Sequence, residues 1–249
     1  MKDMKQYVTA FIQKKVKESP QNSYYQEAIV GFASADDPLY DTLTDAMGRK
    51  MLTPRDMLPE ARTVIVFFIP YAQEVAKAIQ KSGEAISQLW SDLYALTNPL
   101  LSEITEALSE DLQEKGIRCV SDPPTMNYDP VNLTAAWSHK SSAVIAGIAT
   151  FGLNRLIITR KGTMGRLGSL VVDCYMEPDP RPDTEYCLYK KNGSCGVCME
   201  RCPSGAIKPD GFDRFRCNAY LDGKNISDYE QGCSMCSTGP CAIKGFYEV

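Results

Sequence analysis

Eight of the ten cysteines in this 249-residue chain fall within its last 63 residues. Residues 1–18 place apolar side chains at helical spacing among lysines, which predicts an amphipathic surface helix rather than an export signal. Disulfides are rare in proteins that are not exported, so clustered thiols indicate metal ligands. The eight are Cys187, Cys195, Cys198, Cys202, Cys217, Cys233, Cys236 and Cys241.

The segment SCGVCMERCPSGAI (194–207) contains C-x2-C-x3-C-P, three of the four cysteines of a bacterial ferredoxin run. The missing first position falls on Asn192, and Cys187 lies five residues earlier. The loop between Cys187 and Cys195 is long enough to place the Cys187 thiolate beside the other three cysteines, as the missing fourth ligand. Iron requires four sulfur ligands in a near-tetrahedral array, not one fixed spacing.

A second irregular group follows, with Cys217 and then C-x2-C-x4-C. In two-cluster ferredoxins the cysteine before proline binds the other cluster. The spacing therefore predicts two [4Fe–4S] clusters with crossed ligands: Cys187, Cys195, Cys198 and Cys241 for one, and Cys202, Cys217, Cys233 and Cys236 for the other. Two zinc sites, which also take four thiolates each, are the alternative. The remaining cysteines, Cys119 and Cys174, are expected to be buried apolar residues.

Two domains are expected: an α/β domain over residues 1–178 and an iron–sulfur domain over 179–249. The boundary is set by EPDPRPDTEY (177–186), a charged and proline-rich linker. An apolar content of 44% suffices for a core in the first domain, whereas the second is too poor in aliphatic residues to fold without its metal. The net charge of −4 argues against a polyanion as the main partner.

The pattern of the first domain predicts alternating helices and strands. A helix is expected to end near Ile29, a buried strand to cover VIVFFIP (64–70), and a helical region over 72–115 to be interrupted at Asn98 and Pro99. Residues 123–132 are expected to be irregular. The small-residue stretch from Ser138 predicts a closely packed helix that ends in a turn over 147–152. KGTMGRLG (161–168) predicts a glycine-rich, hairpin-like turn.

Four segments resemble the epoxyqueuosine reductase and reductive dehalogenase superfamily: LPEARTVIVFFIPY (58–71), SHKSSAVIAGIATFGLNRLIIT (138–159), GTMGRLGSLVVD (162–173), and the cysteine-rich segment with CMERCPSGAI and RCNAYLDG. The resemblance implies an α+β fold, with a nitroreductase-like α/β domain followed by a bacterial-ferredoxin-like domain that holds two [4Fe–4S] clusters. It further implies cobalamin bound between the two.

Cobalamin in that superfamily has its lower base detached and no histidine ligand. The one histidine, His139, lies outside any Asp-x-His-x-x-Gly motif, and we expect it to be a capping or packing residue. Glycine would let the backbone approach a large macrocycle; tight turns are the alternative. The candidate cofactor-binding residues are Gly147, Gly152, Gly162, Gly165 and Gly168.

The resemblance also implies a proton donor ahead of the small-residue helix. The nearest candidate is Asp129 in NYDP, although an Asp-Pro pair is also common in turns.

The expected function is that of a cobalamin-dependent reductase that takes electrons from a donor such as a reduced flavodoxin or ferredoxin and acts on a small molecule or a corrinoid. The alternatives are an electron-transfer protein that serves a partner or a flavin-like cofactor without substrate chemistry of its own, and clusters with a structural role only. The acidic charge and the short sequence after Cys241 lead us to expect that tRNA is not a partner. No apolar run approaches the roughly 20 residues that cross a bilayer, so we expect no membrane contact and a cytoplasmic location.

Overall fold

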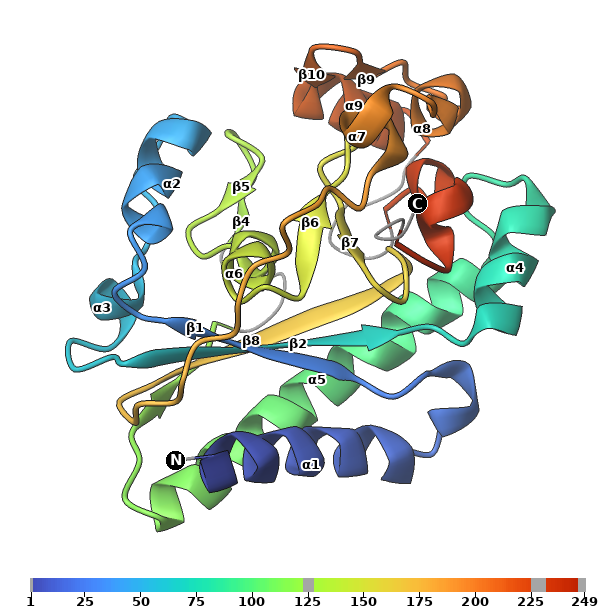
Figure 1. Cartoon of the computed structure of the whole chain (residues 1–249). Coiled ribbons are helices and arrows are strands. Elements are labelled where there is room, and N and C mark those ends of the chain that lie inside the picture. Colours follow the sequence, from blue (N-terminus) through green and yellow to red (C-terminus); the bar gives the residue numbers. More distant parts are fainter. Residues whose placement is uncertain (1, 123–127, 225–231, 246–249) are drawn as a thin grey trace.

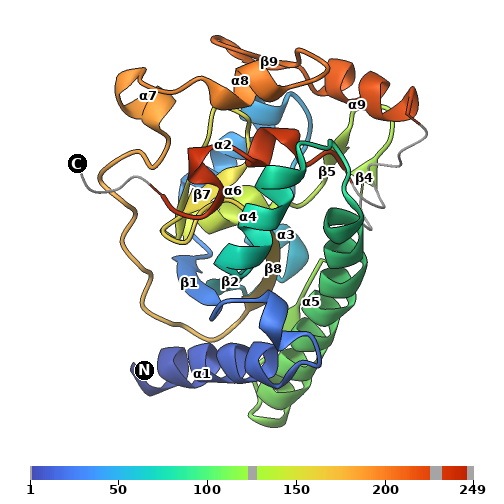
Figure 2. The ribbon, with the colours of Figure 1, turned by 90° about the vertical axis from the view of Figure 1, so that its right-hand side faces the viewer.

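A four-stranded antiparallel sheet forms the centre of the molecule (Figure 1). The computed structural model describes residues 2–122, 128–224 and 232–245. The strand order is β1 (Ile29–Ser34), β2 (Thr63–Pro70), β8 (Gly165–Val172) and β3 (Cys119–Val120). Helices α1 (Lys2–Glu18) and α5 (Gln88–Glu114) lie on one side of the sheet, and the cysteine-rich segment lies on the other (Figures 1 and 2).

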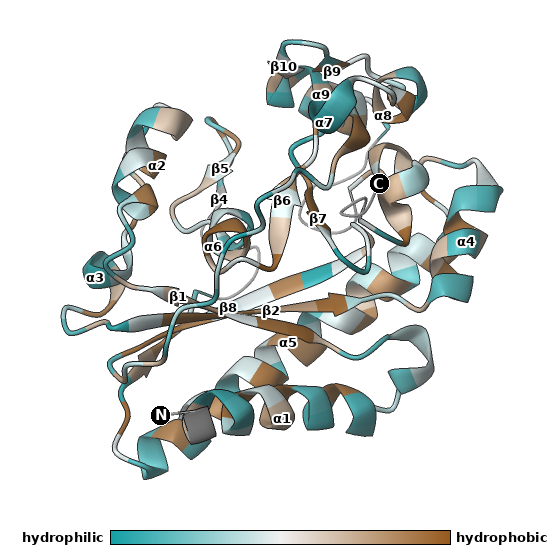
Figure 3. Ribbon diagram, in the orientation of Figure 1, coloured by the Kyte–Doolittle hydropathy of each residue, from teal (hydrophilic) through white to brown (hydrophobic). Residues whose placement is uncertain are grey.

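The central strand β2 is buried along its whole length, as its apolar run predicted. Its side chains alternate between the two faces of the sheet. Ile65, Phe67 and Ile69 join the core beneath α1 and α5, whereas Val64, Val66 and Phe68 join the core on the other face. Figure 3 shows the largely apolar strands between more hydrophilic helices.

Three helices lie around the first core: α1 (Lys2–Glu18), α4 (Gln73–Ser82) and α5 (Gln88–Glu114). The interruption expected at Asn98 and Pro99 is wrong, because α5 continues through Pro99. The break falls earlier, where Gly83 has a φ of 66° and the Ser87 hydroxyl accepts a hydrogen bond from the Trp90 N–H. Packing of α5 along the sheet offsets the cost of a proline inside a helix, about 3 kcal/mol.

The opposite face carries short elements. The small-residue helix α6 (His139–Ile145) packs on the sheet, as predicted, and Ser138 is its N-cap. Side chains of α6, β7 and the neighbouring loops share the second core with Trp137 and Tyr40. The remaining elements on this face are α2 (Leu39–Met47), α3 (Pro54–Met57), the hairpin of β4 (Tyr128–Asp129) and β5 (Thr134–Ala135), and the hairpin of β6 (Ala149–Phe151) and β7 (Ile157–Thr159).

Four expectations about local structure are wrong. Instead of a helix ending near Ile29, a 3-10 turn, η1 (Asn22–Tyr24), leads to β1, since pairing with β2 over six residues outweighs local preference. Residues 149–151 form β6 rather than the end of a helix or a turn. The glycine-rich turn ends at Gly162, and residues 165–168 belong to β8. Tyr128 and Asp129 pair with β5, whereas 123–127 lie outside the described residues.

The expected linker lies against the sheet. The Asp179 N–H donates to the Phe32 carbonyl at 2.8 Å, and the Phe32 N–H donates to the Asp179 carboxylate at 3.0 Å. Lys5 of α1 forms an ion pair with Asp179 at 2.6 Å. The segment therefore protects the outer edge of β1, which would otherwise expose unpaired backbone groups.

The cysteine module, residues 179–249, folds into short elements after this linker (Figure 2). Its small core of Tyr186, Cys187 and Ile207 is shared with Leu153 and Ile158 of the first domain. The domain boundary at residue 178 stays a prediction, and side chains from both sides of it pack in this one core. The elements are α7 (Leu188–Asn192), α8 (Val197–Arg201), β9 (Ile207–Lys208), β10 (Gly211–Phe212), α9 (Arg214–Asp222), η2 (Met235–Ser237) and η3 (Pro240–Ala242).

Among the described helices, none combines the length and the apolar character that a bilayer crossing requires.

Candidate metal centres in the cysteine module

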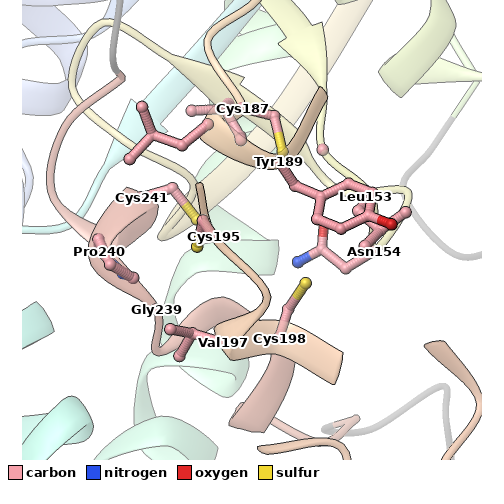
Figure 4. Close-up of a pocket in the computed structure, with 13 residues that line it drawn as sticks. Leu153, Asn154, Cys187, Tyr189, Cys195, Val197, Cys198, Gly239, Pro240 and Cys241 are labelled. Atoms are coloured by element: carbon pink, nitrogen blue, oxygen red, sulfur yellow. The ribbon is translucent and has the colours of Figure 1, made fainter. Parts of the chain in front are cut away.

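A pocket lined by four cysteines lies between three segments of the chain (Figure 4). Cys187 precedes α7, Cys195 and Cys198 come from the loop before α8 and from α8 itself, and Cys241 comes from η3. The hairpin of β6 and β7 closes the pocket with Leu153, Asn154 and Ile158. These four cysteines are the set assigned to one cluster from the sequence; their role as ligands stays a prediction.

Burial disfavours charge on these thiols in the absence of a metal. It raises the pKa of Cys198 to about 11, and the neighbouring Cys187 and Cys195 add to the shift. The pKa of Cys241 rises to about 12, first through burial and then through Cys187, Cys198 and Cys195. Metal ligation requires thiolates. The Cys198 and Cys241 sulfurs therefore need a compensating cation to become thiolates, which an iron–sulfur core would supply.

The second set of cysteines converges on Cys236. Burial raises the pKa of Cys236, and electrostatic repulsion from Cys233, Cys217 and Cys202 raises it further. Cys233 lies before η2 and Cys236 lies within it. This 3-10 helix packs on α8, and Cys202 follows the last residue of α8. Cys233, Cys217 and Cys202 are thus close enough to act on the charge of Cys236, and the grouping of these four as ligands stays a prediction.

The pKa of Cys202, unlike that of Cys236, is lowered. Burial acts to raise it, but hydrogen bonds from the Ser204 hydroxyl and from the N–H groups of Ala206, Ile207 and Ser204 outweigh that effect. The Ser204 Oγ lies 3.2 Å from the Cys202 Sγ. The turn after the Cys-Pro pair thus stabilises a thiolate, as a cluster ligand requires.

No three His, Cys, Asp or Glu side chains within the described ranges converge on a single point that would hold one metal ion. In the first set the cysteines surround a pocket instead.

Several polar side chains that the sequence did not single out donate hydrogen bonds to the backbone of residues 236–239, between η2 and η3. The Asn154 side chain donates to the Cys236 carbonyl at 2.7 Å. Gln80 of α4 donates to the carbonyls of Thr238 and Gly239, and Arg201 donates to that of Thr238. Single amides on distant elements carry no local sequence signal, so only the folded chain reveals them.

The five candidate glycines are surrounded by the chain itself. A Cβ at Gly147 would overlap the carbonyl of Pro180, and one at Gly162 would overlap that of Ala242; both residues have positive φ. Replacement of either glycine therefore requires backbone to move.

The other three glycines are packed as closely. Gly165 and Gly168 lie under the aromatic rings of Phe68 and Phe67 of β2, respectively. A Cβ at Gly152 would lie 2.6 Å from the side-chain oxygen of Asn154. Close internal packing thus accounts for all five glycines. Their role as cofactor-binding residues stays a prediction.

Asp129 lies in a tight turn at the end of β4. Its carboxylate accepts hydrogen bonds from the N–H groups of Val131 and Asn132 and from the Asn132 side chain, and forms an ion pair with Arg49 at 3.2 Å. The Asn132 side chain, the backbone donors and Arg49 lower the pKa of Asp129. The carboxylate is therefore ionised and held in the turn, and its role as a proton donor stays a prediction.

His139 follows the cap residue Ser138 and packs beneath the sheet, as expected. Its Nδ1 lies 2.8 Å from the Ser169 Oγ, which also accepts a hydrogen bond from the Trp137 indole at 2.9 Å. Burial, assisted by the charge of Arg166, lowers the pKa of His139 to about 4. The imidazole is therefore neutral at physiological pH.

Comparisons with known proteins point to one superfamily, although no family model matches the chain. The epoxyqueuosine reductase of Pseudomonas aeruginosa is 28% identical over 184 residues, which are 71% of this chain and 46% of that enzyme. The enzyme of Bacillus subtilis is 24% identical over 244 residues, 84% of this chain and 58% of its own. The chain thus spans about half the length of the curated relatives it matches.

Solved structures show the same likeness in fold. An epoxyqueuosine reductase bound to an epoxyqueuosine-modified tRNA-Tyr stem loop aligns with a TM-score of 0.64 and 20% identity over 99% of this chain and 68% of that one. A catabolic reductive dehalogenase aligns with a TM-score of 0.57 and 14% identity over 84% of this chain and 28% of its own.

The expectation that tRNA is not a partner is wrong. It relied on net charge and on the length of sequence after the last cysteine, yet the structural neighbour that aligns over 99% of this chain carries a tRNA stem loop. Net charge averages over the whole surface and does not exclude a local site for a polyanion. The chain resembles epoxyqueuosine reductases in sequence and both these reductases and the reductive dehalogenases in fold, which is the superfamily its motifs indicated.

Proposed function

We propose that this chain is an iron–sulfur reductase of the epoxyqueuosine reductase type. The observation that carries the proposal is the pocket lined by Cys187, Cys195, Cys198 and Cys241, which come from three segments of the chain. The electrostatic effect of Cys233, Cys217 and Cys202 on Cys236 supports a second set. The homologues support a reductase function; the electron-transfer alternative has no better support. When bound, each cluster stores and passes on one electron. The chain supplies four sulfur ligands per cluster and hydrogen bonds that stabilise the thiolate of Cys202.

The first test of this proposal is composition. Anaerobically purified protein is expected to hold about eight iron atoms and eight sulfide ions per chain, with little zinc, because each of two clusters contributes four of each. Reduced protein is expected to give the low-temperature electron paramagnetic resonance signals of coupled [4Fe–4S] centres. Stoichiometric zinc without iron would refute the proposal.

A nitroreductase-like first domain and a ferredoxin-like cysteine module are part of the proposal. Support comes from the alignment with epoxyqueuosine reductase over 99% of this chain and from the neighbouring reductive dehalogenases. We also propose a cytoplasmic location, since reduced thiols and their clusters persist in reducing compartments.

We propose a corrinoid cofactor on the strength of the fold neighbours, one of which is described in terms of B12-dependent dehalogenation. No residue is assigned to it, because the candidate glycines pack against the chain itself. Anaerobic titration with cobalamin tests this part separately. A shift of the corrinoid spectrum to the base-off form supports it, and an unchanged spectrum with intact clusters would refute it.

The proposed substrate class is an epoxide-bearing modified nucleoside in a tRNA stem loop, as bound by the structural neighbour. The assay is anaerobic conversion of an epoxyqueuosine-containing stem loop, followed by nucleoside mass spectrometry. Loss of 16 mass units, about the mass of one oxygen atom, is the expected product signature for two-electron reduction of the epoxide. No conversion by cluster-loaded, corrinoid-loaded protein would refute this substrate.

The proton-donor role proposed for Asp129 is tested with two variants of one turn. Asp129→Asn removes the titratable group, whereas Asn132→Ala removes only a hydrogen bond to it. If Asp129 supplies the proton, the first variant loses conversion while cluster reduction persists, and the second retains conversion. Equal conversion by Asp129→Asn and the unmodified protein would assign the residue to the turn alone.

A further inference from the structure

Asn154 lies between the two sets of cysteines. It is on the turn between β6 and β7, outside the cysteine module, and only 5% of the residue is exposed. Its side chain lines the pocket of the Cys187 set. The same side chain donates a hydrogen bond to the carbonyl of Cys236, in the second set, at 2.7 Å. One buried amide thus borders the first set and is bonded to the backbone of the second.

The orientation of the Asn154 amide is fixed at its oxygen. This oxygen accepts a hydrogen bond from the Leu156 N–H at 3.2 Å, which identifies the other end of the amide as the nitrogen. Gly152 leaves room for the oxygen, since a Cβ there would lie 2.6 Å from it. Figure 4 shows the nitrogen pointing into the pocket, on the side where Cys198 lies. The donor end of the amide therefore faces the cysteines.

The amide nitrogen has a donor to spare. A carboxamide carries two N–H donors. Within the ranges that the structure describes, the Cys236 carbonyl is the one acceptor bonded to the Asn154 nitrogen. A buried donor without an acceptor costs free energy, so buried N–H groups are nearly always paired. The sulfurs of an iron–sulfur cluster are acceptors of the kind that this second N–H lacks.

We infer that the Asn154 amide donates a hydrogen bond to a sulfur of the cluster held by the Cys187 set and thereby raises its reduction potential. This inference rests on the proposed function, because it requires a cluster at those cysteines. A reduced cluster carries one more negative charge than an oxidised one, so an N–H donor at its sulfur stabilises the reduced form more.

Gln80 shows what a purely structural amide does in the same place. From α4, its side chain donates to the carbonyls of Thr238 and Gly239 at 3.0 and 2.9 Å, so it tethers the segment that Asn154 also tethers. Gln80 is not among the residues that line the pocket within the described part of the chain. The two amides therefore share the tethering role and differ in their access to the cluster.

The test compares Asn154→Ala and Asn154→Leu with Gln80→Ala in cluster-loaded protein. Both Asn154 variants lack the donor, and leucine keeps most of the volume of the side chain. The measurement is an anaerobic redox titration followed by electron paramagnetic resonance, which gives the reduction potential of each cluster. Iron content and urea denaturation report separately on the loss of the tether.

In both Asn154 variants, one of the two clusters is expected to become about ten-fold harder to reduce, the effect of one hydrogen bond to a charged group. For a one-electron couple this is a fall of about 59 mV in the potential. Gln80→Ala is expected to lose stability, as Asn154→Ala does, while both potentials stay at the values of the unmodified protein.

Three results would overturn the inference: unchanged potentials in both Asn154 variants, an equal shift in Gln80→Ala, or loss of iron from both Asn154 variants while Gln80→Ala keeps its iron. Each would assign Asn154 to holding the segment alone. Absence of iron from the unmodified protein is a different failure, since it would overturn the proposed function itself.

Discussion

Substitution of Gly147 by alanine measures how tightly the linker is packed on the first domain. Gly147 has a φ of 75°, a left-handed conformation that costs a residue with a Cβ about 1–2 kcal/mol. The new Cβ would also overlap the carbonyl of Pro180, a backbone atom that cannot rotate away. Overpacking of this kind costs about 1–3 kcal/mol more. We therefore expect the free energy of unfolding to fall by about 2–5 kcal/mol.

Gly48 provides the matched control. It has a φ of 68°, but a Cβ there would have no neighbour within 4 Å. Gly48→Ala is therefore expected to lose only the conformational part, about 1–2 kcal/mol. The assay is urea denaturation of both variants, followed by circular dichroism. Equal losses would show that the backbone at Gly147 is open, as a cofactor cradle would require, and would refute the packing explanation.

Two further predictions concern titration and one concerns the linker. The single histidine, His139, is expected to titrate with a pKa of about 4 rather than 6.5 when followed by nuclear magnetic resonance. As the pH falls, the unfolded chain binds a proton at this residue before the folded chain does. His139 therefore contributes stability above pH 6.5 that is lost as the pH falls toward 4. A value near 6.5 would place the ring in solvent. The lowered pKa of Asp129 contributes stability above its ordinary value of 3.8 that is lost as pH falls below it, so Asp129→Asn is expected to flatten the acid limb of a thermal-midpoint profile; an unchanged limb would contradict the turn contacts. Asp179→Ala removes one ion pair and one hydrogen bond at the edge of β1 and is expected to speed proteolytic cleavage within 177–186; cleavage at the rate of the unmodified chain would show that the segment is held by other contacts.

Sequence patterns specified the elements whose signal is strong and local. The apolar run of β2 and the lysine-studded periodicity of α1 each indicated the right structure, because burial on both faces and burial on one stripe leave different patterns. The closely packed helix after Ser138 was also indicated by a local pattern of small residues.

The errors came where tertiary contacts outweigh local preference. Gly165 and Gly168 were expected in a turn, yet they lie in β8, since the rings of Phe68 and Phe67 fill the space that their side chains would occupy. Pro99 was expected to end a helix, but α5 continues because it packs along the sheet. Neither effect is visible in a sequence until the neighbouring strand is placed.

The sequence was sufficient to propose the ligands of the candidate site, which stay a prediction, but it did not indicate the residues that surround them. The grouping of the cysteines was inferred from spacing alone, because in two-cluster ferredoxins the cysteine before proline binds the other cluster. The residues that hold the site together could not be found this way: Asn154, Gln80 and Arg201 reach it from three different elements. The same limit applies to tRNA, which total charge wrongly argued against.

The crossed grouping of the cysteines is tested most directly by pairs of serine substitutions and the iron content of each variant. Cys187→Ser with Cys198→Ser removes two ligands of the same proposed cluster, so about four of about eight iron atoms are expected to remain. Cys198→Ser with Cys202→Ser removes one ligand from each, so nearly all iron is expected to be lost, while Cys119→Ser with Cys174→Ser keeps about eight. Retention of about four iron atoms by the Cys198 and Cys202 pair would place both residues on one cluster and contradict the account.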